Sequence, residues 1–216
     1  MRLARFDDGK IGLVRDGMIA DVSRICGVDP AEWPATGMCR VIAGFADLAP
    51  KLAGVDWSAA KPISSVRLLS PIAWPSKVIA YPVNYHAHGK EMSAQYRADV
   101  QGFFLKPNSS LSGVSDGIVL PDVPGREIHH ECELGIIIGK RVRHIARDKA
   151  FDAIFGYSCL LDMVIRGREE RVMRKAYDTF CPLGPWIVTA DEVGDPSALD
   201  MKLWVGNELR QSANTR

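Results

Sequence analysis

Short runs of alternating apolar and polar residues, separated by turn signals, open the chain. They cover residues 2–6, 11–15 and 18–22, and an Asp-Gly pair stands in each of the two gaps. Alternation with a period of two is typical of half-buried strands, and Asp-Gly favours a tight turn. The pattern therefore predicts a β-meander at the N-terminus.

From residue 29 to about residue 61 the apolar positions follow a weaker, helical pattern. These side chains gather between Val41 and Leu48, and we expect Pro50 to interrupt the helix because proline lacks the backbone N–H. We assign residues 1–68 to a small, strand-rich N-terminal domain and residues 69–216 to a larger second domain.

Strand-like segments dominate the second domain. We expect strands at 66–69, 78–81, 118–120, 128–138, 153–162 and 186–190, and helices at 84–96 and 167–175. Because strands far outnumber helices, the sequence predicts a β-rich α+β fold rather than a doubly wound parallel sheet.

Charge and cysteine usage exclude several classes of function. The 27 Lys and Arg residues nearly cancel the 26 Asp and Glu residues, so no net field draws the protein to nucleic acid or to an anionic membrane. Residues 1–20 carry charges where a signal peptide needs an apolar core, and no run reaches the ~18 apolar residues of a membrane span. We therefore expect a cytoplasmic protein whose five scattered cysteines are reduced thiols.

Two glutamates stand inside one of the strongest strand segments. In a strand, Glu131 and Glu133 point to the same face, with Cα atoms roughly 6.5 to 7 Å apart. That spacing lets both carboxylates reach one ion. A solvated strand face explains the pair equally well, so both interpretations stand on this motif alone.

A third carboxylate favours the metal interpretation. Asp162 ends the apolar run 157–161, where an unpaired charge costs several kcal/mol. Three carboxylates without a Cys or His cluster select a hard cation with oxygen ligands, which predicts Mg²⁺ or Mn²⁺ and disfavours zinc.

One histidine also has a carboxylate at helical spacing. His88 and Glu91 stand at i and i+3, so they share a helix face, and the carboxylate can orient the imidazole as a base toward water. An ordinary pair on a solvated helix has the same spacing, and this alternative stays open.

Several short motifs together resemble a known family. The most specific are Asn84-Tyr85 with His88 and Glu91, Phe104-Leu105-Lys106-Pro107, and His130-Glu131-Cys132-Glu133-Leu134. Further matches follow in order at Gly139-Lys140, Gly156-Tyr157, Asp162, Arg166, Lys175, Asp178-Thr179-Phe180, Gly184-Pro185-Trp186, Gln211 and Thr215. By their number, order and spacing, the chain resembles the fumarylacetoacetate hydrolase family over nearly its whole length.

The resemblance implies a role for each matching residue. Glu131, Glu133 and Asp162 match the family's ligands for Mg²⁺ or Mn²⁺, a site that Ca²⁺ can fill in crystals. His88 and Glu91 match its water-activating pair, and Lys175 matches a lysine that stabilises developing negative charge. Substrate contacts are expected from Tyr85, Lys106 and Arg166.

The resemblance also implies the architecture: a mixed β-sandwich roll, a homodimer, and further chain beyond residue 216 in family members. We therefore expect the second, catalytic domain to be incomplete at its C-terminus. Gly167 follows Arg166 where relatives often have Asp, so substrate contacts in the helix that comes next cannot be transferred.

The function expected from these residues is metal-dependent hydrolysis of a carbon–carbon bond in a small diketo acid, such as an acylpyruvate or a fumarylpyruvate-like acid. Decarboxylation, or enol–keto isomerisation of a hydroxymuconate-type acid, is an alternative on the same site. A noncatalytic metal-binding or assembly protein with the same fold is a third hypothesis.

Overall fold

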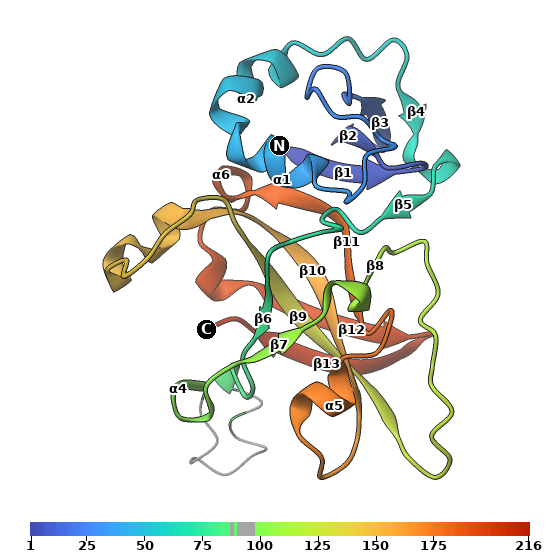
Figure 1. Ribbon diagram of the computed structural model, residues 1–216, viewed down its shortest axis with the longest axis vertical. Helices are drawn as coiled ribbons and strands as arrows, with labels where there is room; N and C mark the ends of the chain where they lie inside the picture. Colours follow the sequence, from blue (N-terminus) through green and yellow to red (C-terminus); the bar gives the residue numbers. More distant parts are fainter. Residues whose placement is uncertain (87–88, 90–97) are drawn as a thin grey trace.

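The computed structural model describes residues 1–86, 89 and 98–216, and its centre is one large, mostly antiparallel sheet (Figure 1). The order of its main path is β4-β3-β2-β1-β11-β10-β9, with β5 pairing beside β1 and β8 beside β11. Strands prevail over short helices, which confirms the β-rich α+β prediction.

The first three strands form the predicted meander. They are β1 (Arg2–Phe6), β2 (Lys10–Arg15) and β3 (Met18–Asp21). Strand β1 also pairs with β11, where Leu3 lies opposite Ile187, so the N-terminal strands share a sheet with the strands of the second domain. The domain boundary at residue 68 stays a prediction.

Two helices, α1 (Gly37–Ala43) and α2 (Phe45–Ala53), follow the meander. Pro50 lies inside α2, so the prediction that it ends the helix was wrong. The proline removes one backbone hydrogen bond, but the next turn is held by Leu52, whose side chain is only 1% exposed in the main core. Burial of this leucine outweighs the missing bond.

The remaining elements are short. The strands are β4 (Lys61–Pro62), β5 (Leu68–Leu69), β6 (Val78–Ala80), β7 (Phe104–Lys106), β8 (Leu111–Ser112), β12 (Asp200–Val205) and β13 (Glu208–Asn214); the helices are α4 (Ala98–Gln101), α5 (Arg171–Lys175) and α6 (Ala190–Val193). Four 3₁₀ turns cover Ile63–Ser65, Asn108–Ser110, Arg147–Ala153 and Pro196–Ala198. None of the described helices has the length and apolar character that crossing a membrane requires.

The strand predicted at residues 118–120 does not form. Pro121 and Pro124 follow it closely and cannot donate to a ladder, and the Val119 N–H instead donates to the Thr179 hydroxyl at 2.8 Å. Ile118 packs on the small core around Phe180, so the segment is anchored without strand pairing.

Three long strands carry the residues of interest: β9 (Ile128–Ile138), β10 (Ile154–Ile165) and β11 (Cys181–Thr189). Figure 1 shows the β9–β10 ladder running away from the N-terminal strands toward α5. Gly135 and Ile137 are buried whereas Ile136 and Ile138 are 53% and 58% exposed. Because side chains alternate, Glu131 and Glu133 share the inner face with Ile137.

Candidate active site

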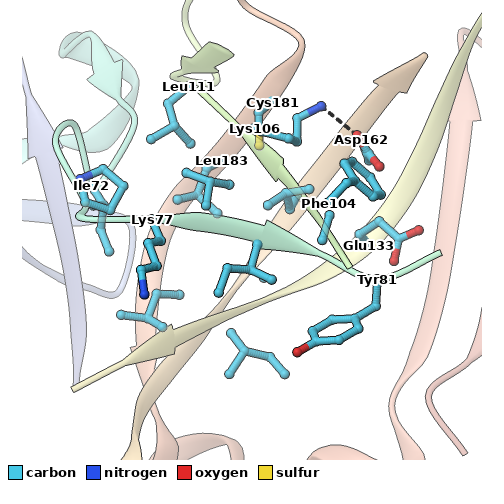
Figure 2. A pocket seen from close by; sticks show the side chains of 18 of the residues that line it. Ile72, Lys77, Tyr81, Phe104, Lys106, Leu111, Glu133, Asp162, Cys181 and Leu183 are labelled. Atoms are coloured by element: carbon cyan, nitrogen blue, oxygen red, sulfur yellow. Dashed lines mark hydrogen bonds and ion pairs between the residues drawn. The ribbon is translucent and has the colours of Figure 1, made fainter. Parts of the chain in front are cut away.

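A broad cleft of about 1620 Å³ opens over the inner face of β9 and β10. Figure 2 shows Lys106, Asp162 and Glu133 toward one end and apolar side chains such as Ile72 and Leu183 toward the other. Pockets for small molecules usually enclose about 300–1,000 Å³, so a small acid would fill only the polar part.

The antiparallel register brings the three carboxylates to one place in this cleft. Asp162 of β10 lies directly opposite Glu131 of β9, and Leu160 lies opposite Glu133. All three acidic side chains line the cleft. Directly opposed residues have Cβ atoms about 4.5–5.5 Å apart, so the ladder itself sets the spacing of Glu131 and Asp162.

Lys175, the last residue of α5, joins two of these carboxylates. Its Nζ donates to Glu131 Oε2 and to Asp162 Oδ2, both at 2.6 Å. The ammonium also lies 5.3 Å from the centre of the Phe104 ring. Lys175 is 8% exposed, and its contact with the buried Asp162 is shielded from water, whereas Glu131 is partly solvated.

Lys106, on β7, approaches Asp162 from the other side. Its Nζ donates to Asp162 Oδ1 and to the backbone carbonyl of Lys175, each at 2.6 Å. The side chain of Lys106 is only 2% exposed. Lys106 thus neutralises Asp162 and holds the end of α5 in place, and its substrate contact stays a prediction.

Glu133 is the carboxylate without a lysine partner among the described residues. Burial, together with the negative charges of Glu131 and Asp162, raises its pKa to about 7, although a hydrogen bond from Tyr85 and the charge of Lys175 oppose the shift. A raised pKa marks negative charge that the surroundings do not balance. A cation bound here would balance it.

Tyr85 lies against the same strand. Its hydroxyl oxygen accepts a hydrogen bond from the Leu134 N–H at 3.0 Å, and burial raises the pKa of the hydroxyl. Tyr85 therefore supports the position of Glu133, whereas its contact with substrate stays a prediction.

Of the remaining predicted site residues, only Arg166 lies in the part of the chain that the structure describes, where it forms no ion pair with the three carboxylates. The Arg166 side chain is exposed and lines the cleft. His88 and Glu91 lie outside the described residues, so their predicted role in activating water stays a prediction.

The donor set suits a hard cation in its chemistry. Glu131, Glu133 and Asp162 offer only oxygen atoms and line one cleft, as Mg²⁺ and Mn²⁺ sites require. In the described part of the chain, however, no three acidic, His or Cys side chains already surround one point as metal ligands would. The Lys175 ammonium lies between two of the carboxylates instead, so the carboxylates would have to turn toward an entering ion.

No role was predicted for Gln211, which matched the family only as one short motif. Its side chain reaches the backbone of Cys132, between the two glutamates. No spacing rule could indicate this contact, because the two residues are 79 positions apart.

Comparison with known proteins identifies the family of this chain. The sequence profile described as fumarylacetoacetate (FAA) hydrolase C-terminal matches residues 77–216. The maleylpyruvate hydrolase of Aquipseudomonas alcaligenes is 38% identical over 228 aligned positions, which cover 100% of this chain and 79% of that protein.

Solved structures show the same likeness. The crystal structure of maleylpyruvate hydrolase from Sphingobium sp. SYK-6 in complex with manganese(II) and pyruvate is 57% identical, with a TM-score of 0.90, and the match covers 100% of this chain and 77% of that one. A 5-carboxymethyl-2-hydroxymuconate delta-isomerase from Mycobacterium smegmatis is 30% identical, with a TM-score of 0.71 over 100% of this chain and 75% of that one. The resemblance seen in the sequence is confirmed, and the chain belongs to the fumarylacetoacetate hydrolase family.

Proposed function

We propose that this chain hydrolyses a carbon–carbon bond in maleylpyruvate or a closely similar diketo acid, with Mg²⁺ or Mn²⁺ as cofactor. The observation that carries the proposal is that Glu131, Glu133 and Asp162 line one cleft on the inner face of the β9–β10 ladder. The likeness to two maleylpyruvate hydrolases, one of them holding manganese and pyruvate, supports the choice of substrate and metal.

The three carboxylates would hold the metal, which supplies a Lewis acid for the carboxylate and adjacent keto oxygen of the substrate. His88, oriented by Glu91, would take a proton from water as the water adds to the distal carbonyl. Breaking the carbon–carbon bond then releases a carboxylic acid and leaves its electron pair on the pyruvate enolate. Lys175 lies next to the ligands, where its ammonium can stabilise that negative charge until carbon takes a proton.

A second candidate is enol–keto isomerisation on the same site. The likeness to a hydroxymuconate delta-isomerase favours it, and this reaction needs a stabilised enolate but no attacking water. The two candidates therefore differ in their need for His88.

We also infer that the chain forms a homodimer. Three large apolar side chains on the β12–β13 hairpin are 50–55% exposed: Trp204, Val205 and Leu209. Exposed apolar side chains that lie close together favour association between protein chains. Light scattering during size-exclusion chromatography tests this; a mass near that of one 23.8 kDa chain would contradict it.

The function is tested by assaying the purified protein with Mn²⁺, and with a chelator, on maleylpyruvate, an acylpyruvate, oxaloacetate and a hydroxymuconate-type acid. We expect metal-dependent hydrolysis of the first two, which Glu131→Gln abolishes. His88→Asn should abolish hydrolysis while Mn²⁺ still binds. Turnover that persists without metal would contradict the mechanism, and isomerisation alone would favour the second candidate. Mn²⁺ binding without turnover of any of these acids would favour the noncatalytic hypothesis.

A further inference from the structure

Strand β9 has an open edge beside the carboxylates. Among the described residues it pairs only with β10, and it is the last strand of the large sheet. The backbone N–H and C=O of Cys132, which stands between Glu131 and Glu133, face this open edge, since both bond to a side chain there. An open edge leaves such groups without strand partners and lets the backbone shift.

The Gln211 side chain occupies this edge. Its Oε1 accepts from the Cys132 N–H at 2.8 Å, and its Nε2 donates to the Cys132 carbonyl at 2.9 Å. In an antiparallel ladder, two opposed residues exchange the same pair of bonds. The side-chain amide thus replaces a neighbouring strand at a single residue.

The β12–β13 hairpin, which carries Gln211, has a β-bulge at this point. Leu203 of β12 lies opposite Gln211, but Trp204 lies opposite Leu209, so Arg210 is an extra residue that makes a bulge in β13. A bulge bends a strand and changes the direction of the neighbouring side chains. The irregularity lies directly beside the residue that reaches β9.

We infer that Gln211 is a positioning residue for the metal ligands, acting through the backbone of Cys132. The proposal rests on the metal site of the proposed function. Because Glu131 and Glu133 flank Cys132, fixing both polar groups of that residue fixes the Cα positions from which the two carboxylates extend. Gln211 contacts neither carboxylate in the described structure, so its effect on metal binding is indirect.

The test compares Gln211→Met, Gln211→Ala and a control in the same strand. Methionine has nearly the volume of glutamine but no amide, so it separates hydrogen bonding from packing. The control is Asn214→Ala: the Asn214 amide also donates twice, to Asp200 Oδ1 at 2.8 Å and to the Ala198 carbonyl at 3.4 Å, but only within its own hairpin region.

Two readouts decide the outcome: Mn²⁺ affinity by calorimetry and hydrogen exchange of the segment 131–134. We expect both Gln211 variants to bind Mn²⁺ roughly tenfold more weakly, as is usual when a residue that supports a ligand is lost. We also expect the Cys132 amide to exchange about tenfold faster, the effect of losing one hydrogen bond. Asn214→Ala should lower the melting temperature while keeping wild-type affinity.

Gln211→Met at wild-type Mn²⁺ affinity would overturn this inference and leave the proposed function standing. Equal loss of affinity in Asn214→Ala would also overturn it, because general weakening of the hairpin would then explain both variants. Failure of the wild-type chain to bind Mn²⁺ would contradict the proposed metal site, and this inference with it.

Discussion

Asp162 lies directly opposite Glu131 in the β9–β10 ladder, and the Lys175 ammonium bridges their carboxylates with two contacts of 2.6 Å. The two acids are far apart in sequence, but the antiparallel register makes them neighbours. Their side chains differ in burial, 8% exposed for Asp162 and 26% for Glu131. Replacing the carboxylate with an amide should therefore change the stability of the protein by different amounts at the two positions.

Replacing Asp162 with Asn should lower both the stability of the protein and its affinity for the metal. Lys106, 2% exposed, would lose its only carboxylate partner among the described residues, and removing one partner of a buried ion pair costs about 3–5 kcal/mol. Glu131→Gln should lose Mn²⁺ binding too, at a stability cost of only about 1 kcal/mol, because Glu131 is partly solvated. Urea unfolding and calorimetry measure the two effects.

Glu127→Gln is the matched control for these variants. Glu127 lies next to the start of β9 but is 79% exposed, and within the described residues its carboxylate pairs only with His129. It should keep wild-type stability and Mn²⁺ affinity. If Asp162→Asn were as stable as Glu131→Gln, the buried pair with Lys106 would not have the importance assigned to it.

The sequence predicted the parts of this site that depend on local periodicity. The period-two pattern around Glu131 and Glu133 was sufficient to place both acids on one strand face, and the run that ends at Asp162 was sufficient to identify a second long strand. Which face is buried could not be read from the pattern, because the opposite face is the more apolar one and yet its Ile136 and Ile138 are exposed.

Contacts between segments that are distant along the chain could not be predicted from the sequence. The bonds of Lys106 to Asp162 and to the Lys175 carbonyl depend on how β7 and α5 meet, and no spacing encodes that. The error at Pro50 has a similar origin, since a local rule for proline does not include the burial of Leu52. The resemblance identified the candidate residues, whereas packing determines their partners.

Stability should depend on pH through Glu192, which follows β11. The Met1 ammonium lies 2.8 Å from one Glu192 oxygen, and Arg2 Nε lies 2.7 Å from the other. The hydrogen bond that the amino terminus donates, and then the one from Arg2, hold the pKa of Glu192 below its usual 4.5. A lowered folded-state pKa gives stability that is present above pH 4.5 and is lost as pH falls through the folded value.

Glu192→Gln should therefore be less stable than wild type near pH 7, and the difference should shrink as pH drops below 4.5. Because the group is solvated, we expect only about 0.5 kcal/mol near neutrality. Glu208→Gln is the control, since Glu208 pairs with Arg210 on its own exposed strand. Urea titrations at a series of pH values measure both, and a constant difference for Glu192→Gln would contradict the linkage.

Tyr85→Phe should weaken metal binding while the aromatic ring stays in place. The change removes the acceptor for the Leu134 N–H, so the strand beside Glu133 loses a support and that carboxylate can shift. We expect a stability loss of about 1 kcal/mol and a Mn²⁺ affinity several-fold lower. Tyr81→Phe is the control, because Tyr81 also lines the cleft near Glu133 but is 55% exposed (Figure 2). Equal effects at the two tyrosines would count against a role for the Tyr85 hydroxyl.

Lys175→Met should make the protein depend more strongly on metal for its stability. Without the ammonium, and counting the described residues, Glu131 loses its ion-pair partner and Asp162 keeps only Lys106, so the metal-free protein should be less stable by about 2 kcal/mol. A bound dication replaces the lost charge, so Mn²⁺ should raise the melting temperature of the variant more than that of wild type. Hydrolysis should fall at least about a hundredfold if Lys175 also stabilises the enolate, a typical loss for a single charge-stabilising group. The comparison is Arg174→Met, which removes a cation from the same helix but leaves the three carboxylates untouched. In the part of the chain that the structure describes, Arg174 donates only to the backbone carbonyls of Glu169 and Ile165. A Mn²⁺-induced rise that is no larger in Lys175→Met than in Arg174→Met would show that the ammonium and the metal do not neutralise the same charges.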